Sequence, residues 1–344
     1  MTQPQPGSAA SGAASGAASG AASGDFAALT ATATRLQQTI EQVIEGKAEV
    51  VRAALTVLFA GGHLLIEDVP GVGKTMLSKT LARAIDGTVR RIQFTPDLLP
   101  SDVTGVSIFN QDTRNFEFRP GGVFANIVVG DEINRASPKT QSALLECMEE
   151  RQVTVDNATY YLDEPFMVIA TQNPIEMEGT YPLPEAQRDR FMARVSMGYP
   201  VPTAELAMLE SHTGLSPLDE VEPVTSAAEV AKLVDVVRGV FVAPSVQRYA
   251  VDIAVGTRRS PDLRLGASPR ATLHLVRAAK AWAALEQRDY VVPDDIQRLV
   301  SPVLAHRLLL APEAAMGGRL PEQVLASAVA AVPVPDAQTH SSKG

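Results

Sequence analysis

Two short groups of residues in this chain have the types and spacing that phosphate chemistry needs. The first is Gly71-Val72-Gly73-Lys74-Thr75, which follows the apolar run 64–66 and precedes a helical pattern over 76–85. Glycines let backbone N–H groups turn toward anionic oxygens, and a helix N-terminus adds partial positive charge. The sequence predicts a nucleotide-binding loop from Pro70 to Met76, in which Lys74 reaches the outer phosphates and the Thr75 hydroxyl holds Mg²⁺.

The second group is Gly130-Asp131-Glu132, which ends the apolar run 127–129. A strand that delivers two adjacent carboxylates at its C-terminal end places them where ligands bind in open α/β sheets. Asp131 is therefore expected to hold Mg²⁺, directly or through water, and Glu132 to activate the attacking water. The first group, the loop before Lys74, departs from the strict phosphate-loop pattern at one place, because Asp68 stands where that pattern has glycine.

Several further strings make the chain resemble the MoxR family of AAA+ ATPases. One of them opens with Gly130-Asp131-Glu132-Ile133-Asn134-Arg135, and the others follow the family's order along the chain. The five strings are residues 93–102, 130–146, 170–176, 178–187 and 266–270. The resemblance covers residues from about 40 to 310. It implies ATP and Mg²⁺ as ligands, a hexameric ring of identical chains, and a client protein that the ring remodels.

The resemblance also implies roles for residues outside the loop. Asn173 is similar to the family's sensor 1, whose amide orients the attacking water and senses the γ-phosphate. Arg190, in Asp189-Arg190-Phe191, is similar to the arginine finger that completes the site of a neighbouring subunit. The family usually has an apolar residue where this chain has Arg188. Two arginines two positions apart on a helix cannot point the same way, so only one of them can be the finger. We favour Arg190 for this role.

Two more positions complete the implied nucleotide site. Arg270 begins a helix behind Ser268-Pro269, a cap residue followed by proline at the first helical position. It is similar to sensor 2, which couples a lid domain to the nucleotide. Ile44 lies in the segment where the family packs adenine, although its apolar side chain equally suits the protein core.

The elements that must position these residues follow from the apolar patterning. The β-prone runs 63–67, 89–94, 127–129 and 166–170 are separated by longer segments, as in parallel strands with helical crossovers. The sequence thus predicts an α/β fold, a phosphate-loop AAA+ core with a small all-α C-terminal lid. Residues 105–124 and 151–162 are expected to form two hairpin insertions, which in the family's rings project to engage clients.

Charge and composition divide the chain into segments. Residues 1–225 carry 16 basic and 28 acidic side chains, whereas residues 226–332 carry 13 basic and 10 acidic ones. We expect a flexible Ser/Gly/Ala tail over 1–24, a core over 25–200, a proline-containing linker over 201–225, a helical lid over 226–332 and a flexible end over 333–344. The lid helices are expected at 227–242, 245–258, 269–286, 293–310 and 321–332.

Composition also narrows the functional classes. The formal net charge of −9 disfavours a nucleic-acid partner, and the single Cys147 cannot form an intramolecular disulfide. No stretch is long and apolar enough to suggest membrane insertion, and a cytoplasmic location is expected. The resemblance points to client proteins with von Willebrand factor type A domains. Two alternatives stay open, a nucleotide-gated scaffold with little turnover and a chelatase-like or helicase-like motor. A GTPase is disfavoured, because the sequence has no Asn-Lys-x-Asp string for guanine after the second carboxylate strand.

Overall fold

The centre of the chain is a five-stranded parallel sheet. The computed structural model describes residues 14–69, 72–173, 181, 183–199 and 217–335. Neighbouring strands are parallel, and their spatial order is β2-β5-β8-β1-β9. The strands are β1 (Leu64–Glu67), β2 (Val89–Gln93), β5 (Ile127–Asp131), β8 (Met167–Gln172) and β9 (Ala193–Val195). The α/β class is confirmed, while the edge strand β9 was not predicted, because its three residues give no alternating signal.

Helices cover both faces of this sheet. Leu64 and Ile66 of β1 lie in an apolar core shared with the N-terminal helices, α3 (Lys74–Ala84) and the C-terminal helices. Leu65 points to the other face, where α5 (Pro138–Glu150) packs. The residues that follow β1, β5 and β8 form one edge of the sheet, called here the C-terminal edge. The residues that precede the strands form the opposite, N-terminal edge.

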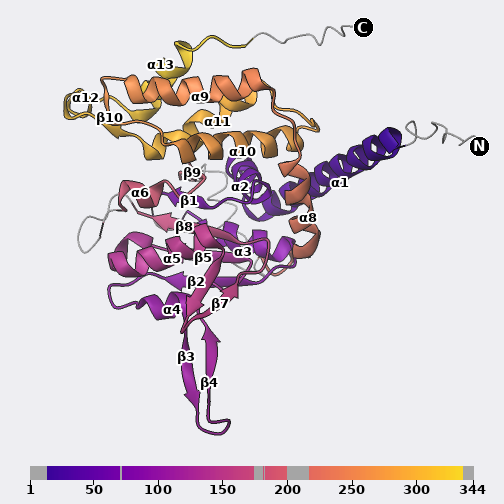
Figure 1. Cartoon of the computed structure of the whole chain (residues 1–344), viewed down its shortest axis with the longest axis vertical. Coiled ribbons are helices and arrows are strands. Elements are labelled where there is room, and N and C mark those ends of the chain that lie inside the picture. Colours follow the sequence, from indigo (N-terminus) through magenta and orange to yellow (C-terminus); the bar gives the residue numbers. More distant parts are fainter. Residues whose placement is uncertain (1–13, 70–71, 174–180, 182, 200–216, 336–344) are drawn as a thin grey trace, which may run out of the picture.

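Two β-hairpins interrupt the core at the predicted places. β3 (Gly105–Asn110) pairs antiparallel with β4 (Asn115–Pro120) after the short helix α4 (Pro100–Thr104), and this hairpin projects from the body (Figure 1). β6 (Gln152–Val155) pairs antiparallel with β7 (Ala158–Tyr161). The rings of Phe118 and Tyr160 stack with centroids 3.9 Å apart, so the two hairpins contact each other.

The N-terminal helix starts earlier than the sequence predicted. α1 (Ala14–Val43) begins inside the segment 1–24 that was expected to be a flexible tail, and it departs from that expectation over residues 14–24. Alanine has the highest helix propensity, and this segment is rich in it. Further along α1, Leu29, Leu36 and Ile40 are fully buried, so packing fixes this part of the helix. α2 (Ala48–Phe59) follows after a short turn.

The C-terminal region is mainly helical and packs on the core. Its first helix, α8 (Ala227–Arg238), contacts α1 and α2, so it lies against the N-terminal helices. The expected all-α lid is corrected in one detail: β10 (Leu263–Leu265) and β11 (Leu309–Leu310) form a short antiparallel pair. Residues 201–216 of the expected linker and 336–344 of the expected tail lie outside the described residues. The helices are α8 (Ala227–Arg238), α9 (Pro244–Arg259), α10 (Pro269–Leu285), α11 (Pro293–Leu304), η2 (Ala305–Arg307), α12 (Pro312–Met316) and α13 (Pro321–Ala330).

None of the helices in the described ranges is long and apolar enough to cross a membrane.

Candidate active site

The predicted phosphate loop joins β1 to α3 at the C-terminal edge of the sheet. Gly73 caps the helix with a φ of +91°, a left-handed conformation that favours glycine. Lys74 is the first residue of α3, and its Nζ donates to the carbonyl of Asp68 at 2.8 Å. Val72 and Met76 are partly buried against the apolar core. Pro70 and Gly71, which were expected to cradle phosphate, lie outside the described residues.

Asp131 ends β5 beside the start of α3. Its side chain is 8% exposed, and the Thr75 hydroxyl donates to its Oδ2 at 3.4 Å. The Thr171 hydroxyl donates to its Oδ1 at 3.3 Å. A hydroxyl and a carboxylate are hard oxygen donors of the kind Mg²⁺ prefers, and Mg²⁺ usually keeps waters and substrate phosphates as its other ligands. Thr75 and Asp131 therefore fit the predicted metal site.

Glu132 stands next to Asp131 in an unusual backbone conformation. Its φ is +56°, and its N–H donates to the Thr171 hydroxyl at 3.0 Å. Its carboxylate accepts from Arg135 at 2.9 Å and from Gln93 Nε2 at 3.2 Å. The left-handed turn directs the side chain away from the strand path, and residues in such conformations cluster at active sites.

Asn173 follows β8, which lies between β5 and β1 in the sheet. Its side chain is 5% exposed. Because parallel strands bring their carboxyl ends to the same edge, Asn173 shares the C-terminal edge with Lys74, Asp131 and Glu132. The edge thus collects a cation, two carboxylates and an amide from three strands.

Asp68 explains why this loop departs from the strict glycine pattern. Its Oδ2 accepts from Gly198 N at 2.6 Å and from the Ser196 hydroxyl at 3.0 Å, and its Oδ1 accepts from Val69 N at 2.9 Å. Burial alone would raise the pKa of Asp68, but these hydrogen bonds hold it below its ordinary value. The aspartate fastens the phosphate loop to the segment after β9, which a glycine cannot do.

The segment after β9 is also tied to the turn between α1 and α2. Lys47 Nζ donates to the carbonyls of Gly198 at 3.3 Å and Tyr199 at 2.9 Å. Ile44, in the same turn, is 6% exposed and packs in the apolar core. The turn is therefore held beside the phosphate loop, while contact of Ile44 with adenine stays a prediction.

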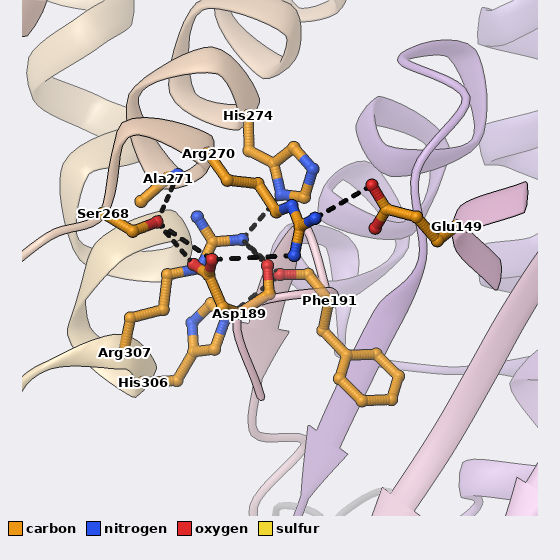
Figure 2. A network of polar contacts seen from close by, with 9 residues as sticks. All are labelled: Glu149, Asp189, Phe191, Ser268, Arg270, Ala271, His274, His306 and Arg307. Atoms are coloured by element: carbon orange, nitrogen blue, oxygen red, sulfur yellow. Dashed lines mark hydrogen bonds and ion pairs between the residues drawn. The ribbon is translucent and has the colours of Figure 1, made fainter. Parts of the chain in front are cut away.

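Arg270 does not lie with these residues. Met192 N donates to the His63 carbonyl at 2.8 Å, and Ala193 pairs with Leu64, so the chain just before β9 lies at the N-terminal edge. Arg270 contacts that chain: its guanidinium lies 3.9 Å from the Asp189 carboxylate and 2.9 Å from Glu149 (Figure 2). Arg270 was predicted to couple the lid to the nucleotide. It lies at the edge opposite the phosphate loop of its own chain, and its contact with a nucleotide stays a prediction.

Arg188 and Arg190 flank Asp189 at the same N-terminal edge. Both are partly exposed, and neither side chain forms an ion pair with any residue that the structure describes. Arg188 ends the short helix α6 (Glu185–Arg188), whereas Arg190 lies beyond it, so the two are not on one helix face. Neither arginine reaches the phosphate loop of its own chain.

Comparisons with known proteins agree with this architecture. A profile described as the ATPase family associated with various cellular activities (AAA) matches residues 63–193, and an AAA lid domain profile matches residues 255–328. The "Chaperone MoxR1" of Mycobacterium tuberculosis is 40% identical over 308 residues, which cover 87% of this chain and 81% of that protein. The chain belongs to the MoxR family of AAA+ ATPases.

Two other similarities span nearly the same length. The "Uncharacterized protein YeaC" of Bacillus subtilis is 52% identical over 290 residues, 84% of this MoxR-family chain and 91% of that one. A crystal structure of a protein assigned as an ATPase from Cytophaga hutchinsonii has a TM-score of 0.86 and 38% identity. It covers 92% of this chain and 98% of its own. The AAA+ core and lid are therefore shared along almost the whole chain.

Sequence reasoning missed several residues around the site. Arg91 Nε lies 2.6 Å from Asp131 Oδ2, and Thr171 bridges Asp131 and Glu132. Arg91 and Gln93 share one face of β2 and lie beside β5, so the parallel pairing of two predicted strands could have suggested their proximity. Nothing in the local sequence indicated Arg307, which reaches Asp189 from the lid.

Proposed function

We propose that this MoxR-family chain binds ATP at the loop before α3 and hydrolyses it with Mg²⁺ held by Thr75 and Asp131. The observation that carries the proposal is the gathering of Lys74, Asp131, Glu132 and Asn173 at one sheet edge, beside a helix N-terminus. Thr75 and Asp131 are already within hydrogen-bonding distance, so little rearrangement is needed to share one cation.

Each residue has a separate task in this proposal. Lys74 binds the outer phosphates, and the N–H groups at the start of α3 bind the oxygens between them. Mg²⁺, when bound, supplies charge neutralisation at the phosphate oxygens. Glu132 accepts a proton from the attacking water, and the Asn173 amide orients that water. Gln93 and Arg135, which now hold the Glu132 carboxylate, must release or redirect it when the nucleotide binds.

We further propose that the chain works as a homo-oligomer, a hexameric ring. Arg188 and Arg190 lie at the N-terminal edge, whereas the phosphate loop lies at the C-terminal edge. An arginine that serves hydrolysis from this position must therefore act on another copy of the chain. We assign Arg190 to this role, because it lies beyond the end of α6. The segment around it is fixed by hydrogen bonds from Arg307 to the carbonyls of Asp189 and Phe191.

The ring is proposed to remodel a client protein; in support, the M. tuberculosis relative is named a chaperone. The β3–β4 hairpin supports this role, since it projects from the core (Figure 1) and its Phe109 and Phe116 are 49% and 72% exposed. A client with a von Willebrand factor type A domain is proposed from the family resemblance alone. The cytoplasm is the proposed location, and no nucleic-acid partner is proposed for this acidic chain.

The Glu132→Gln variant tests the hydrolytic site. We expect ADP and ATP affinity to change less than about twofold, while turnover falls by about 10²–10⁴, the usual contribution of a general base. Glu146→Gln, on the exposed side of α5, is the matched control and should keep the wild-type rate. Hydrolysis by Glu132→Gln at the wild-type rate would overturn the assignment.

The same variant tests client binding. With hydrolysis blocked and ATP bound, Glu132→Gln should retain a partner that wild-type protein releases, and a pull-down with identification by mass spectrometry measures this. Absence of ATP turnover in the wild-type protein, with partner affinity that differs between ADP and ATP, would instead indicate the nucleotide-gated scaffold.

A further inference from the structure

The lid holds the chain segment that contains Arg190 through a compact polar cluster around Asp189 (Figure 2). The Ser268 hydroxyl lies 2.9 Å from both carboxylate oxygens of Asp189, and Arg307 Nε lies 3.4 Å from Oδ1. Ser268 belongs to the start of α10 and Arg307 to η2, so two separate elements of the lid meet one carboxylate of the core.

Arg307 forms hydrogen bonds with the backbone on both sides of Arg190. One of its terminal nitrogens donates to the carbonyl of Asp189 at 3.3 Å and to the carbonyl of Phe191. The same nitrogen contacts His274 Nδ1 at 2.6 Å, and His306 Nε2 contacts the Phe191 carbonyl at 3.2 Å. Because the carbonyls before and after Arg190 are both held, the Arg190 backbone cannot shift independently of the lid.

The charged pair at the centre of this cluster is largely buried. The Arg307 side chain is 2% exposed and that of Asp189 is 16% exposed. Burial lowers the pKa of Arg307 to about 10, although Asp189 counteracts it, so Arg307 still carries its charge at neutral pH. A buried cation that loses its carboxylate is strongly disfavoured, and the two residues therefore stay together when the lid moves.

Arg270 is joined to the same unit. Ser268 caps α10 by accepting from Ala271 N at 3.0 Å, and Arg270 lies in the first turn of that helix, 3.9 Å from the Asp189 carboxylate. The backbone on both sides of Arg190 and the side chain of Arg270 thus contact a single polar cluster, although one comes from the core and the other from the lid.

We propose that Asp189 is a positioning residue that fixes Arg190 and Arg270 in one rigid unit, so that a lid movement carries both arginines together to or from the nucleotide site of the neighbouring subunit. This inference rests on the proposed trans action of Arg190. The nucleotide state that moves one subunit's lid then sets the rate at its neighbour's site, not at its own.

Asp189→Asn is the principal test, because it preserves size and removes the charge opposite Arg307. In homogeneous Asp189→Asn rings we expect kcat to fall about 10- to 100-fold, while KM and ADP affinity change less than about twofold. Asp262→Asn is the matched control, since Asp262 pairs with Arg319 within the lid and does not contact the Arg190 segment. A loss of ADP affinity equal to the loss in kcat would indicate a purely structural role and overturn the proposal.

Subunit mixing separates action in trans from action in cis. Glu132→Gln subunits have an inactive site but donate an intact Arg190, whereas Asp189→Asn subunits have an intact site and donate a misplaced one. Mixed rings of these two variants should hydrolyse ATP several-fold faster than the sum of the separate variants. No gain on mixing would overturn the proposal for Asp189.

The same mixing with Arg190→Ala distinguishes the two levels of inference. If Arg190→Ala gains activity with Glu132→Gln but Asp189→Asn does not, the trans arginine stands and the role of Asp189 fails. If neither variant gains activity, the trans action of Arg190 fails as well.

A milder variant covers the case in which Asp189→Asn does not fold. Ser268→Ala removes one lid contact to Asp189 together with the cap of α10. Ser226→Ala removes the equivalent cap of α8 and no contact to Asp189, so it controls for capping alone. We expect Ser268→Ala, mixed with Glu132→Gln, to gain activity and Ser226→Ala to behave as wild type; equal behaviour of the two would overturn the proposal.

Discussion

Arg91 Nε lies 2.6 Å from Oδ2 of Asp131, the oxygen that also accepts the Thr75 hydroxyl. The edge strand β2 thus supplies a cation to the buried carboxylate proposed to bind Mg²⁺. The Arg91 side chain is 54% exposed and can swing away into solvent. Metal binding at Asp131 therefore competes with an ion pair that the protein makes for itself.

Arg91→Met is expected to lower the Mg²⁺ concentration needed for half-maximal ADP binding. An exposed ion pair contributes at most about 1 kcal/mol, which corresponds to a shift of about two- to fivefold. Titration of Mg²⁺ against a fluorescent ADP analogue measures it. Arg90→Met is the control, because Arg90 alternates to the other face of β2 and is exposed. An unchanged or higher Mg²⁺ requirement in Arg91→Met would contradict the expected competition.

Much of the fold and of the C-terminal edge could be predicted because the signals are local. Asp131 and Glu132 directly follow an apolar strand, and Lys74 and Thr75 open a helix after glycines, so each group carries its own context. Arg307 and Asp189 could not be paired from the sequence, since neither lies in a local motif that names its partner.

Asp68 shows a different limit of sequence reasoning. From the sequence, Asp68 is only a mismatch to the phosphate-loop pattern, because that pattern describes only the residues that bind phosphate. The three hydrogen bonds that it accepts come from the loop itself and from the segment after β9, which the sequence does not place nearby. The position of Arg270 could not be predicted for the same reason, since the edge of the sheet that it contacts depends on how the lid docks.

Asp68→Asn should loosen the phosphate loop. Hydrogen bonds to a charged group are each worth about 1.5–3 kcal/mol, so we expect unfolding free energy to fall by about 1–3 kcal/mol and ADP affinity to fall several-fold. Urea unfolding and ADP titration measure the two effects. Asp86→Asn, at an exposed turn, should change neither. Because folding lowers the pKa of Asp68 from its ordinary value of 3.8, Asp68 stabilises the folded state above about pH 3.8. This stabilisation is lost as the pH falls below that value.

The buried His63 and His306 and the half-buried His274 predict that stability falls on acidification. Burial lowers the pKa of His63 to about 4 and that of His274 to about 2, and it holds the pKa of His306 well below its ordinary value. Below about pH 6.5 the unfolded chain takes up protons at these sites and the folded chain does not, so stability decreases by about 1.4 kcal/mol per pH unit for each histidine.

His63→Gln isolates one of these contributions. The amide of glutamine can replace both ring contacts of His63, a donor to the Met148 carbonyl and an acceptor from Val168 N. We expect the slope of unfolding free energy between about pH 6.5 and about pH 5 to decrease by about one proton relative to wild type. Urea unfolding at several pH values gives the slopes, and parallel curves for the two proteins would refute the assignment.

The stacked rings of Phe118 and Tyr160 predict that the two hairpins move together. An aromatic pair contributes about 0.5–1.5 kcal/mol, so Tyr160→Ala should speed amide hydrogen exchange in β3–β4 by about two- to tenfold. Tyr161→Ala is the matched control, because Tyr161 is 77% exposed. Equal exchange in the two variants would show that the hairpins are independent.

The left-handed backbone at Glu132 has a consequence for how this protein can be improved. A non-glycine residue in a left-handed conformation costs of order 1 kcal/mol or more, and glycine or asparagine would relieve that cost. A screen that selected only for resistance to heat would therefore replace Glu132 early, and under the proposed role of Glu132 the selected proteins would hydrolyse ATP more slowly. Engineering of a thermostable form should therefore leave Glu132 unchanged and place the stabilising substitutions elsewhere in the chain.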